Sequence, residues 1–374
     1  MLGNHEKAML VLNALPHLGP VTVGRLLERF GGDPVALMQG TEKEWMDVEG
    51  VGKKIAGTLG DWREHFDLQG ELAKMGNLGV GFVARGRDGF PSLLEKTGDA
   101  PIGLYKLGSL DLDKIRGIAI VGTRRPTLYG QRIAKKVASK LARAGFCIVS
   151  GMARGVDTAA HEGALEVGGQ TVGVLGCGID VVYPPENQGL YRRIASEGAL
   201  LSEFPLGRRA DRQTFPMRNR LVAGMCEGVV VVESAMKGGS LITARQAGEQ
   251  GRSVFAFPGR VDQETSAGCH ALIRDGAVLV TSAEDILDDL LGGGRQGVLD
   301  LQIEVEGKRQ EAGIAELAED EKKVYGALED GATLGLEEIA NTAGVEARVA
   351  AVTLMSLELK RLVAKRLDGK FERR

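Results

Sequence analysis

GIAIVGTRRPTLYGQRIAKKVASKLARAGFCIVSG, residues 117–151, has an apolar run at each end and an amphipathic segment between them. In that segment Ile133, Val137 and Leu141 recur every four residues, and the lysines and arginines lie off this apolar stripe. Gly122 ends the first apolar run, and Gly145 precedes the second. The order strand, glycine turn, helix, strand is one βαβ unit, which predicts a parallel sheet.

The alternation of apolar runs and amphipathic segments continues to about residue 291. It predicts helices at 153–168, 240–250 and 282–291, and strands at 117–122, 146–150, 171–175, 199–202, 228–233, 253–257 and 277–280. Such alternation over about 170 residues is typical of a doubly wound, Rossmann-like, mainly parallel sheet. Ligands bind such sheets beyond the carboxyl ends of the strands.

The turn after the first predicted strand reads Gly122-Thr123-Arg124-Arg125. A glycine at the end of a strand lets the backbone approach a ligand, and free N–H groups at the start of a helix favour an anion. The two arginines suit a phosphate better than an apolar group. We therefore expect this turn to bind a phosphodiester backbone.

Further polar segments follow other predicted strands, at 150–155, 175–187 and 202–220. Segment 202–220, SEFPLGRRADRQTFPMRNR, interleaves arginines with Phe204 and Phe215. This composition suits a single strand, because guanidinium groups bind phosphates and rings stack on bases. It also fits a solvated basic loop that closes a small-nucleotide pocket. Segment 237–243 fits either an anion-binding turn or a capped helix start without a ligand.

The overall charge excludes a protein that coats nucleic acid by bulk attraction. Lys and Arg number 47 and Asp and Glu 50, which gives a formal net charge of −3. Any nucleic-acid site must therefore be a local patch.

The cysteines occur singly and without a CxxC pair, as expected of small buried residues in a reducing cytosol. They are Cys147, Cys177, Cys226 and Cys269. Neither a membrane span nor a signal-like segment is evident, so we expect a cytoplasmic protein.

The flanks of the sheet region predict further domains. Residues 1–75 form a helical domain in which 15–31 and 48–59 each place a hydrophobic-Gly turn before an amphipathic helix, as in helix–hairpin–helix (SAM-like) modules. A small helical interaction domain is the alternative. Residues 76–291 form the extended Rossmann-like domain, and 292–318 a flexible linker. Residues 319–374 give helices at 321–329, 336–343 and 346–360 and a hairpin turning at Asp368-Gly369, which resembles a winged helix.

Several catalytic signatures are absent. Residues 47–54 lack the first glycine and the hydroxyl residue of a phosphate-binding loop, and 176–181 lack the third glycine of a dinucleotide fingerprint. There is no GxSxG or HExxH. We expect Asp157 to accept hydrogen bonds at a helix start and His161 to fix the same turn. Asp180, Glu203 and Glu233 are candidate acid/base carriers, but carboxylates beside a basic groove can equally orient its arginines.

With these motifs together, the chain resembles the DNA-processing protein A (DprA/Smf) family. The resemblance rests on VGTRRPTLYG, SGMARGVDTAAH, VLGCGIDVVYPPEN, LLSEFP, FPMRNRLVAG, VVVVES with GGSLITARQA, and FPGRVDQETSAGCHALIRDGA. It implies a non-enzymatic, cofactor-free protein that binds single-stranded DNA and loads the RecA recombinase during natural transformation. It also implies a homodimer formed through the Rossmann-like domains.

Carried over by position, Arg124 is expected to hold phosphate, Arg212 to hold phosphate and Phe215 to stack a base. Together with the strand-end turns, the expected DNA contacts are Gly122, Thr123, Arg124, Arg125, Gly151, Met152, Arg208, Arg209, Arg212, Phe215, Arg218, Asn219, Arg220, Lys237, Gly238, Gly239 and Ser240. No catalytic or metal-binding residue is expected. The alternative is a nucleotide-processing enzyme of the phosphoribohydrolase type, but residues 237–245 lack the glutamate of that family's PGGxGTxxE signature.

Overall fold

The computed structural model describes residues 2–292, 317–329, 332–360, 362–366 and 368–373. The described residues within 1–126 and 130–290 form one compact unit, and those within 127–129 and 291–374 form the other. The linker predicted at 292–318 falls largely on residues 293–316, which lie outside the described residues. No helix in the described ranges combines the length and apolar character needed to span a membrane.

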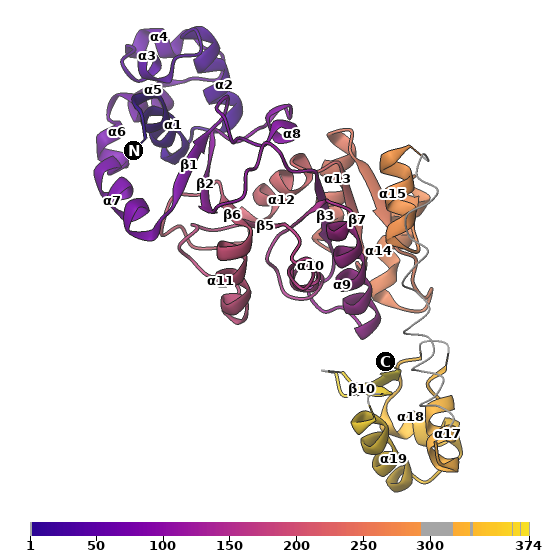
Figure 1. The fold of residues 1–374 in the computed structure, drawn as a ribbon. Coiled ribbons are helices and arrows are strands. Elements are labelled where there is room, and N and C mark those ends of the chain that lie inside the picture. Colours follow the sequence, from indigo (N-terminus) through magenta and orange to yellow (C-terminus); the bar gives the residue numbers. More distant parts are fainter. Residues whose placement is uncertain (1, 293–316, 330–331, 361, 367, 374) are drawn as a thin grey trace. The chain divides into compact units, whose positions relative to one another are not determined.

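The first unit begins with seven short helices (Figure 1). Local sequence sets several of their ends. Pro20 and Pro34 occupy first-turn positions, Thr41 and Glu44 form a capping box, and Gly79 ends the last helix in a left-handed conformation. The helices are α1 (Asn4–Ala14), α2 (Pro20–Arg29), α3 (Pro34–Met38), α4 (Glu42–Met46), α5 (Lys53–Gly60), α6 (Trp62–His65) and α7 (Leu68–Leu78).

A nine-stranded sheet follows, in the order β1-β2-β6-β5-β4-β3-β7-β8-β9. The β1–β2 and β2–β6 pairs are antiparallel, and the other pairs are parallel. The chain winds outward from β3 in both directions, so the topological switch point lies at β3. The strands are β1 (Gly81–Ala84), β2 (Gly103–Gly108), β3 (Gly117–Val121), β4 (Cys147–Ser150), β5 (Thr171–Leu175), β6 (Ala199–Ser202), β7 (Gly228–Val231), β8 (Ser253–Ala256) and β9 (Val278–Leu279).

Helices connect the parallel strands and cover the sheet (Figure 1). The helix α10 packs on β3, β4 and β5, while α11 packs on β2, β5 and β6, and α13 on β7 and β8. The helices of this region are α8 (Ser92–Glu95), α9 (Leu128–Arg143), α10 (Val156–Leu165), a short 3-10 turn (Pro185–Asn187), α11 (Gln188–Glu197), α12 (Thr214–Gly224), α13 (Ser240–Glu249), α14 (Glu264–Arg274) and α15 (Ala283–Leu291).

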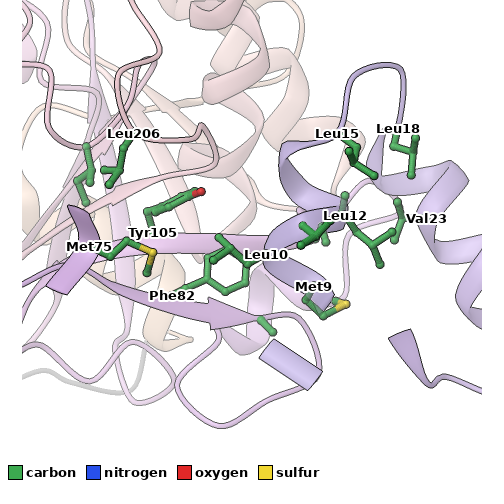
Figure 2. Close-up of a cluster of buried hydrophobic side chains, with 14 of the residues drawn as sticks. Met9, Leu10, Leu12, Leu15, Leu18, Val23, Met75, Phe82, Tyr105 and Leu206 are labelled. Atoms are coloured by element: carbon green, nitrogen blue, oxygen red, sulfur yellow. The ribbon is translucent and has the colours of Figure 1, made fainter. Parts of the chain in front are cut away.

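Separate hydrophobic clusters lie on the two faces of the sheet in the described part of this unit. On β6, Ala199 and Leu201 belong to one cluster and Leu200 to the other, as the alternation of side chains along a strand requires. One cluster continues into the N-terminal helices. Figure 2 shows Leu10 and Leu12 of α1 and Met75 of α7 in the same cluster as Phe82 of β1 and Tyr105 of β2. The first helices therefore share a core with the antiparallel edge of the sheet.

The second unit contains three helices and an antiparallel hairpin within its described residues. These are α17 (Glu319–Gly326), α18 (Leu336–Ala343), α19 (Ala347–Leu359), β10 (Val363–Lys365) and β11 (Phe371–Arg373). Its own core includes Val324, Ile339, Leu354 and Leu357.

The predicted Rossmann-like sheet is confirmed, and all seven predicted strands are present within a residue or two at most ends. The helix predicted at 153–168 is shorter because Gly155, at φ 82°, precedes its first turn. A Cβ at Gly155 would lie 2.9 Å from the Arg124 carbonyl carbon, so the loop before α10 passes too close to the β3 turn for a larger residue.

Candidate nucleic-acid interface

The turn after β3 is held by backbone contacts at the switch point. Thr123 N–H donates to the Glu233 carbonyl at 2.7 Å, and Val156 N–H donates to the Thr123 carbonyl at 3.3 Å. A Cβ on Gly122 would lie 2.6 Å from Val156 Cγ2 and 2.8 Å from the Glu233 carbonyl oxygen, so only glycine fits there. This packing fixes the backbone from which the exposed Arg124 and Arg125 project.

The loop between β4 and α10 is held by Asp157. Its carboxylate accepts the N–H groups of Gly151 at 3.1 Å and Ala153 at 3.2 Å, which is the helix-start role expected of it. Burial raises the pKa of Asp157, and the charge of Arg218 and these backbone donors oppose that rise. Met152 in this loop is buried, and its backbone φ of 60° is one that residues other than glycine rarely adopt. Its carbonyl accepts Asn187 Nδ2–H at 2.9 Å.

The buried Arg218 of α12 links two strand ends. Only 4% of Arg218 is exposed. Its guanidinium donates to the Gly151 carbonyl and, at 2.5 Å, to the Val174 carbonyl, and its Nε–H donates to Asn219 Oδ1 at 3.1 Å. A Cβ on Gly151 would collide with this guanidinium. Arg218 therefore fixes the backbone of the site, while the exposed cations remain available to a ligand.

An aromatic pair lies beside these turns. The Arg124 guanidinium lies 5.2 Å from the ring centroid of Phe215, a cation–π contact. The Phe215 and Tyr183 centroids are 5.5 Å apart with an interplanar angle of 41°. Tyr183 is 38% exposed and Phe215 is half-buried, so both rings can offer surface to a planar ligand.

These elements enclose a groove of about 650 Å³. It lies beyond the carboxyl ends of β3, β4 and β7, where the topology predicts a ligand. An adjoining recess between Tyr183, Phe215 and the 151–154 loop includes Met152. The predicted contacts that line the groove are Gly122, Thr123, Arg124, Arg125, Gly151, Arg212, Phe215, Arg218, Asn219, Gly238, Gly239 and Ser240.

Four predicted contacts, Arg208, Arg209, Arg220 and Lys237, are not among the residues lining this groove or the recess. Arg208 is exposed and pairs with Asp211 at 2.5 Å. Arg220 is buried, pairs with Glu203 and donates to the Asp99 carbonyl. It follows Arg218 by two residues on a helix and so points to a different side.

The other singled-out polar residues also have structural partners. Glu203 pairs with Arg220, and the Asp180 carboxylate accepts Gly207 N–H at 2.8 Å. The expectation that His161 fixes the loop before α10 is wrong. Its ring nitrogen Nδ1 lies 2.7 Å from Thr171 Oγ1 on β5, and burial lowers the pKa of His161 to about 3. Among the described residues no cluster of His, Cys, Asp and Glu is suited to a metal ion.

Tyr183 is not among the contacts expected from the sequence. The sequence does contain a signal for it. Tyr183 lies in the segment 175–187 that follows a predicted strand, and the segments after the other predicted strands are expected at the same edge of the sheet. Nothing in local periodicity shows that Tyr183 and Phe215 meet, since they are separated by α11 and β6.

Comparison with known proteins gives consistent matches. Residues 81–291 match the family model "DNA recombination-mediator protein A". The chain is 33% identical to protein Smf of Synechocystis over all of both chains, and 46% identical to the DNA processing protein DprA of Streptococcus pneumoniae over 54% of this chain and 71% of that protein.

Two solved structures are also similar. The X-ray structure of S. pneumoniae DprA matches with a TM-score of 0.69 and 35% identity, covering 77% of this chain and 99% of that one. DNA processing protein A from Helicobacter pylori, whose structural report describes a single-stranded DNA binding mode, matches with a TM-score of 0.52 and 32% identity over 57% of this chain and 96% of that one. This protein belongs to the DNA recombination-mediator protein A family.

Proposed function

We propose that this protein binds single-stranded DNA in the groove beyond β3, β4 and β7 and presents it to a recombinase of the RecA type during natural transformation. The observation that carries the proposal is the meeting of Arg124, Arg212 and Phe215 at one groove. The arginines can neutralise successive phosphates while the ring stacks on a base. The single-stranded DNA binding of the H. pylori relative supports this assignment.

The chemistry of the groove favours an unpaired strand. Stacking on Phe215 or Tyr183 requires a base whose face is free, and the bases of a duplex are stacked on one another. Base stacking on an aromatic side chain contributes about 1–3 kcal/mol per base. A duplex could use only the phosphate contacts, so it should bind more weakly.

Binding rather than turnover is the proposed activity. The carboxylate of Asp157 is occupied by two backbone N–H groups, and that of Glu203 is paired with Arg220. These contacts orient the loop and the helix. A carboxylate that attacks or activates a ribose needs to face its substrate.

The protein is further proposed to form a homodimer through its Rossmann-like domain. Among the described residues β9 is the last strand of the sheet, and it carries Val278 at 39% and Leu279 at 50% exposure, so its outer edge and apolar side chains can meet a second copy. We also assign the α17–β11 unit as a winged helix and the first helices as a helix–hairpin–helix-like module, from their element order and glycine turns.

A titration tests the proposed activity. A labelled oligothymidylate and the matching duplex are titrated by fluorescence anisotropy at two salt concentrations, and the protein is separately incubated with AMP. Tighter binding of the single strand, weakened by salt, is expected. Release of adenine from AMP without strand binding would favour the phosphoribohydrolase alternative.

A further inference from the structure

Arg154 is an exposed cation beside the aromatic pair and is not among the contacts expected from the sequence. It lines the recess together with Arg124, Tyr183 and Phe215. The loop before α10 passes against the Arg124 backbone, so the two arginines start from neighbouring positions. The Arg124 guanidinium extends to the Phe215 ring. The Arg154 guanidinium extends instead to Glu186, in the turn that follows Tyr183, so the two cations lie at different parts of the recess.

Glu186 pairs with Arg154 through a single oxygen. The Nη2–H and Nε–H of Arg154 donate to Glu186 Oε1 at 2.6 and 3.2 Å, and the two side chains are 49% and 61% exposed. Arg116 instead donates to both oxygens of Glu227, at 2.8 and 2.7 Å, which is the stronger, two-oxygen geometry. An exposed pair with one accepting oxygen contributes little to stability, so its guanidinium can change partners at small cost.

The loops that carry this pair are joined independently of it by Asn187. The Asn187 Nδ2–H groups donate to the Met152 carbonyl and to Thr158 Oγ1, both at 2.9 Å, and the side chain is buried. This buried contact already fixes the two loops against each other. The exposed pair of Arg154 and Glu186 is therefore not needed to hold the recess together.

A phosphate is a better partner for Arg154 than the Glu186 carboxylate. The guanidinium fork matches two oxygens of a phosphate, whereas Glu186 offers one. A nucleotide stacked on Phe215 has a phosphate on each side, and Arg124 reaches the phosphate on one side. We propose that Arg154 forms a second phosphate subsite, which Glu186 occupies until the backbone of a bound strand displaces it. This inference rests on the single-strand binding proposed above.

The pair also shields Arg154 from small anions. A free phosphate has to displace Glu186 unaided. The phosphate of a strand already held at Arg124 and Phe215 arrives at a high effective concentration. Glu186 thus reserves the second subsite for a polymer.

A double-mutant cycle tests the exchange. Anisotropy titrations of a labelled oligothymidylate compare the wild type, Arg154→Ala, Glu186→Gln and the double variant. Glu186→Gln should tighten binding by up to about fivefold, the contribution of one exposed pair, and should gain much less when Arg154 is absent. Arg154→Ala should weaken binding and lower the slope of log K against log salt by about 0.7. Additive effects, or no gain in Glu186→Gln, would overturn the proposal.

Competition by inorganic phosphate tests the shielding. Phosphate should displace the labelled strand more readily from Glu186→Gln than from the wild type, because Arg154 is then open to a small anion. Equal competition in the two proteins would show that Glu186 does not guard Arg154, and the proposal would be wrong.

Glu197→Gln is the matched control for the change in charge. Glu197 pairs with Arg193 at 47% exposure of each side chain. It ends α11 next to the amino end of β6, whereas the groove lies at the carboxyl ends of the strands. Glu197→Gln should leave binding unchanged, and a gain equal to that of Glu186→Gln would reduce the effect to overall charge and refute the exchange. Unchanged thermal unfolding shows that the variants are folded.

Failure of the groove itself gives a different result. A wild type that does not bind the strand, or an Arg124→Ala variant that keeps the full salt slope, would refute the proposed function and the second subsite with it. Normal behaviour of Arg124→Ala with additive effects at Arg154 and Glu186 would refute the second subsite alone.

Discussion

Replacing Arg124 with alanine should weaken single-strand binding and flatten its salt dependence. The Arg124 side chain is exposed at the groove and lies 5.2 Å from the Phe215 ring, where it can reach the phosphate of a stacked nucleotide. Each phosphate neutralised on a single strand contributes about 0.7 to the slope of log K against log salt. Loss of one contact should therefore lower the slope by about 0.7.

The size of the effect depends on the salt concentration. Between about 50 and about 200 mM salt, a slope difference of about 0.7 corresponds to a factor of about 2.6 in the ratio of the two binding constants. The Arg124→Ala variant should thus be most impaired at low salt and approach the wild type as salt rises. This convergence distinguishes a lost phosphate contact from general damage to the groove.

Anisotropy titrations of a labelled oligothymidylate at four or more salt concentrations measure both quantities. Phe215→Ala should lose about 1–3 kcal/mol of stacking at every salt concentration and keep its slope. Arg208→Ala is the matched control, because Arg208 is exposed, pairs with Asp211 and lies outside the groove. An unchanged slope for Arg124→Ala, or an equal loss in Arg208→Ala, would refute the assignment.

Three other predictions concern the scaffold of the site and the C-terminal unit. Arg218→Met should lower the free energy of unfolding in urea by about 3–5 kcal/mol, because it leaves Asp157 buried without its opposite charge. Gly122→Ala should cost about 1–3 kcal/mol in the same assay, since its Cβ meets Val156 and the Glu233 carbonyl. Lys360 and Ser356 lower the pKa of Glu321 to about 2, so the stability of the C-terminal unit should be full above pH 4.5 and fall as the pH drops toward 2. Far-UV circular dichroism during acid titration should show this loss in the wild type and a flatter curve in Glu321→Gln.

The sheet was predictable because its strands are fully buried and read as apolar runs. β3, β4 and β5 are buried along their whole length. Gly145 lies between α9 and β4, and Gly168 lies between α10 and β5, so each helix is separated from the next strand by a glycine. The antiparallel placement of β2 next to β6 was not predictable in the same way. That pairing joins residues about a hundred positions apart, such as Tyr105 with Ser202, and no local pattern encodes it.

The positions of the exposed arginines of the site were predictable from the sequence, whereas the burial of the other two arginines was not. Arg124 and Arg212 lie at strand or helix ends, where topology alone predicts a ligand. In the sequence Arg218 and Arg220 cannot be told apart from Arg124 and Arg212, because arginine is predicted to be exposed wherever it occurs. Only the fold brings the Gly151 and Val174 carbonyls to Arg218 and the Glu203 carboxylate to Arg220.

The division between buried and exposed arginines is consistent with the proposal that a chain with a net charge of −3 binds an anionic strand. Arg218 donates hydrogen bonds to the carbonyls of Gly151 and Val174, at the ends of two strands. The loop before α10 and the end of β5 therefore cannot move independently. Phe215, one turn earlier on α12, then faces Arg124 across a backbone that is already ordered. In the proposed binding mode little further ordering is needed when a strand binds, so a few contacts at Arg124, Arg212 and Phe215 would give affinity without a broadly basic surface.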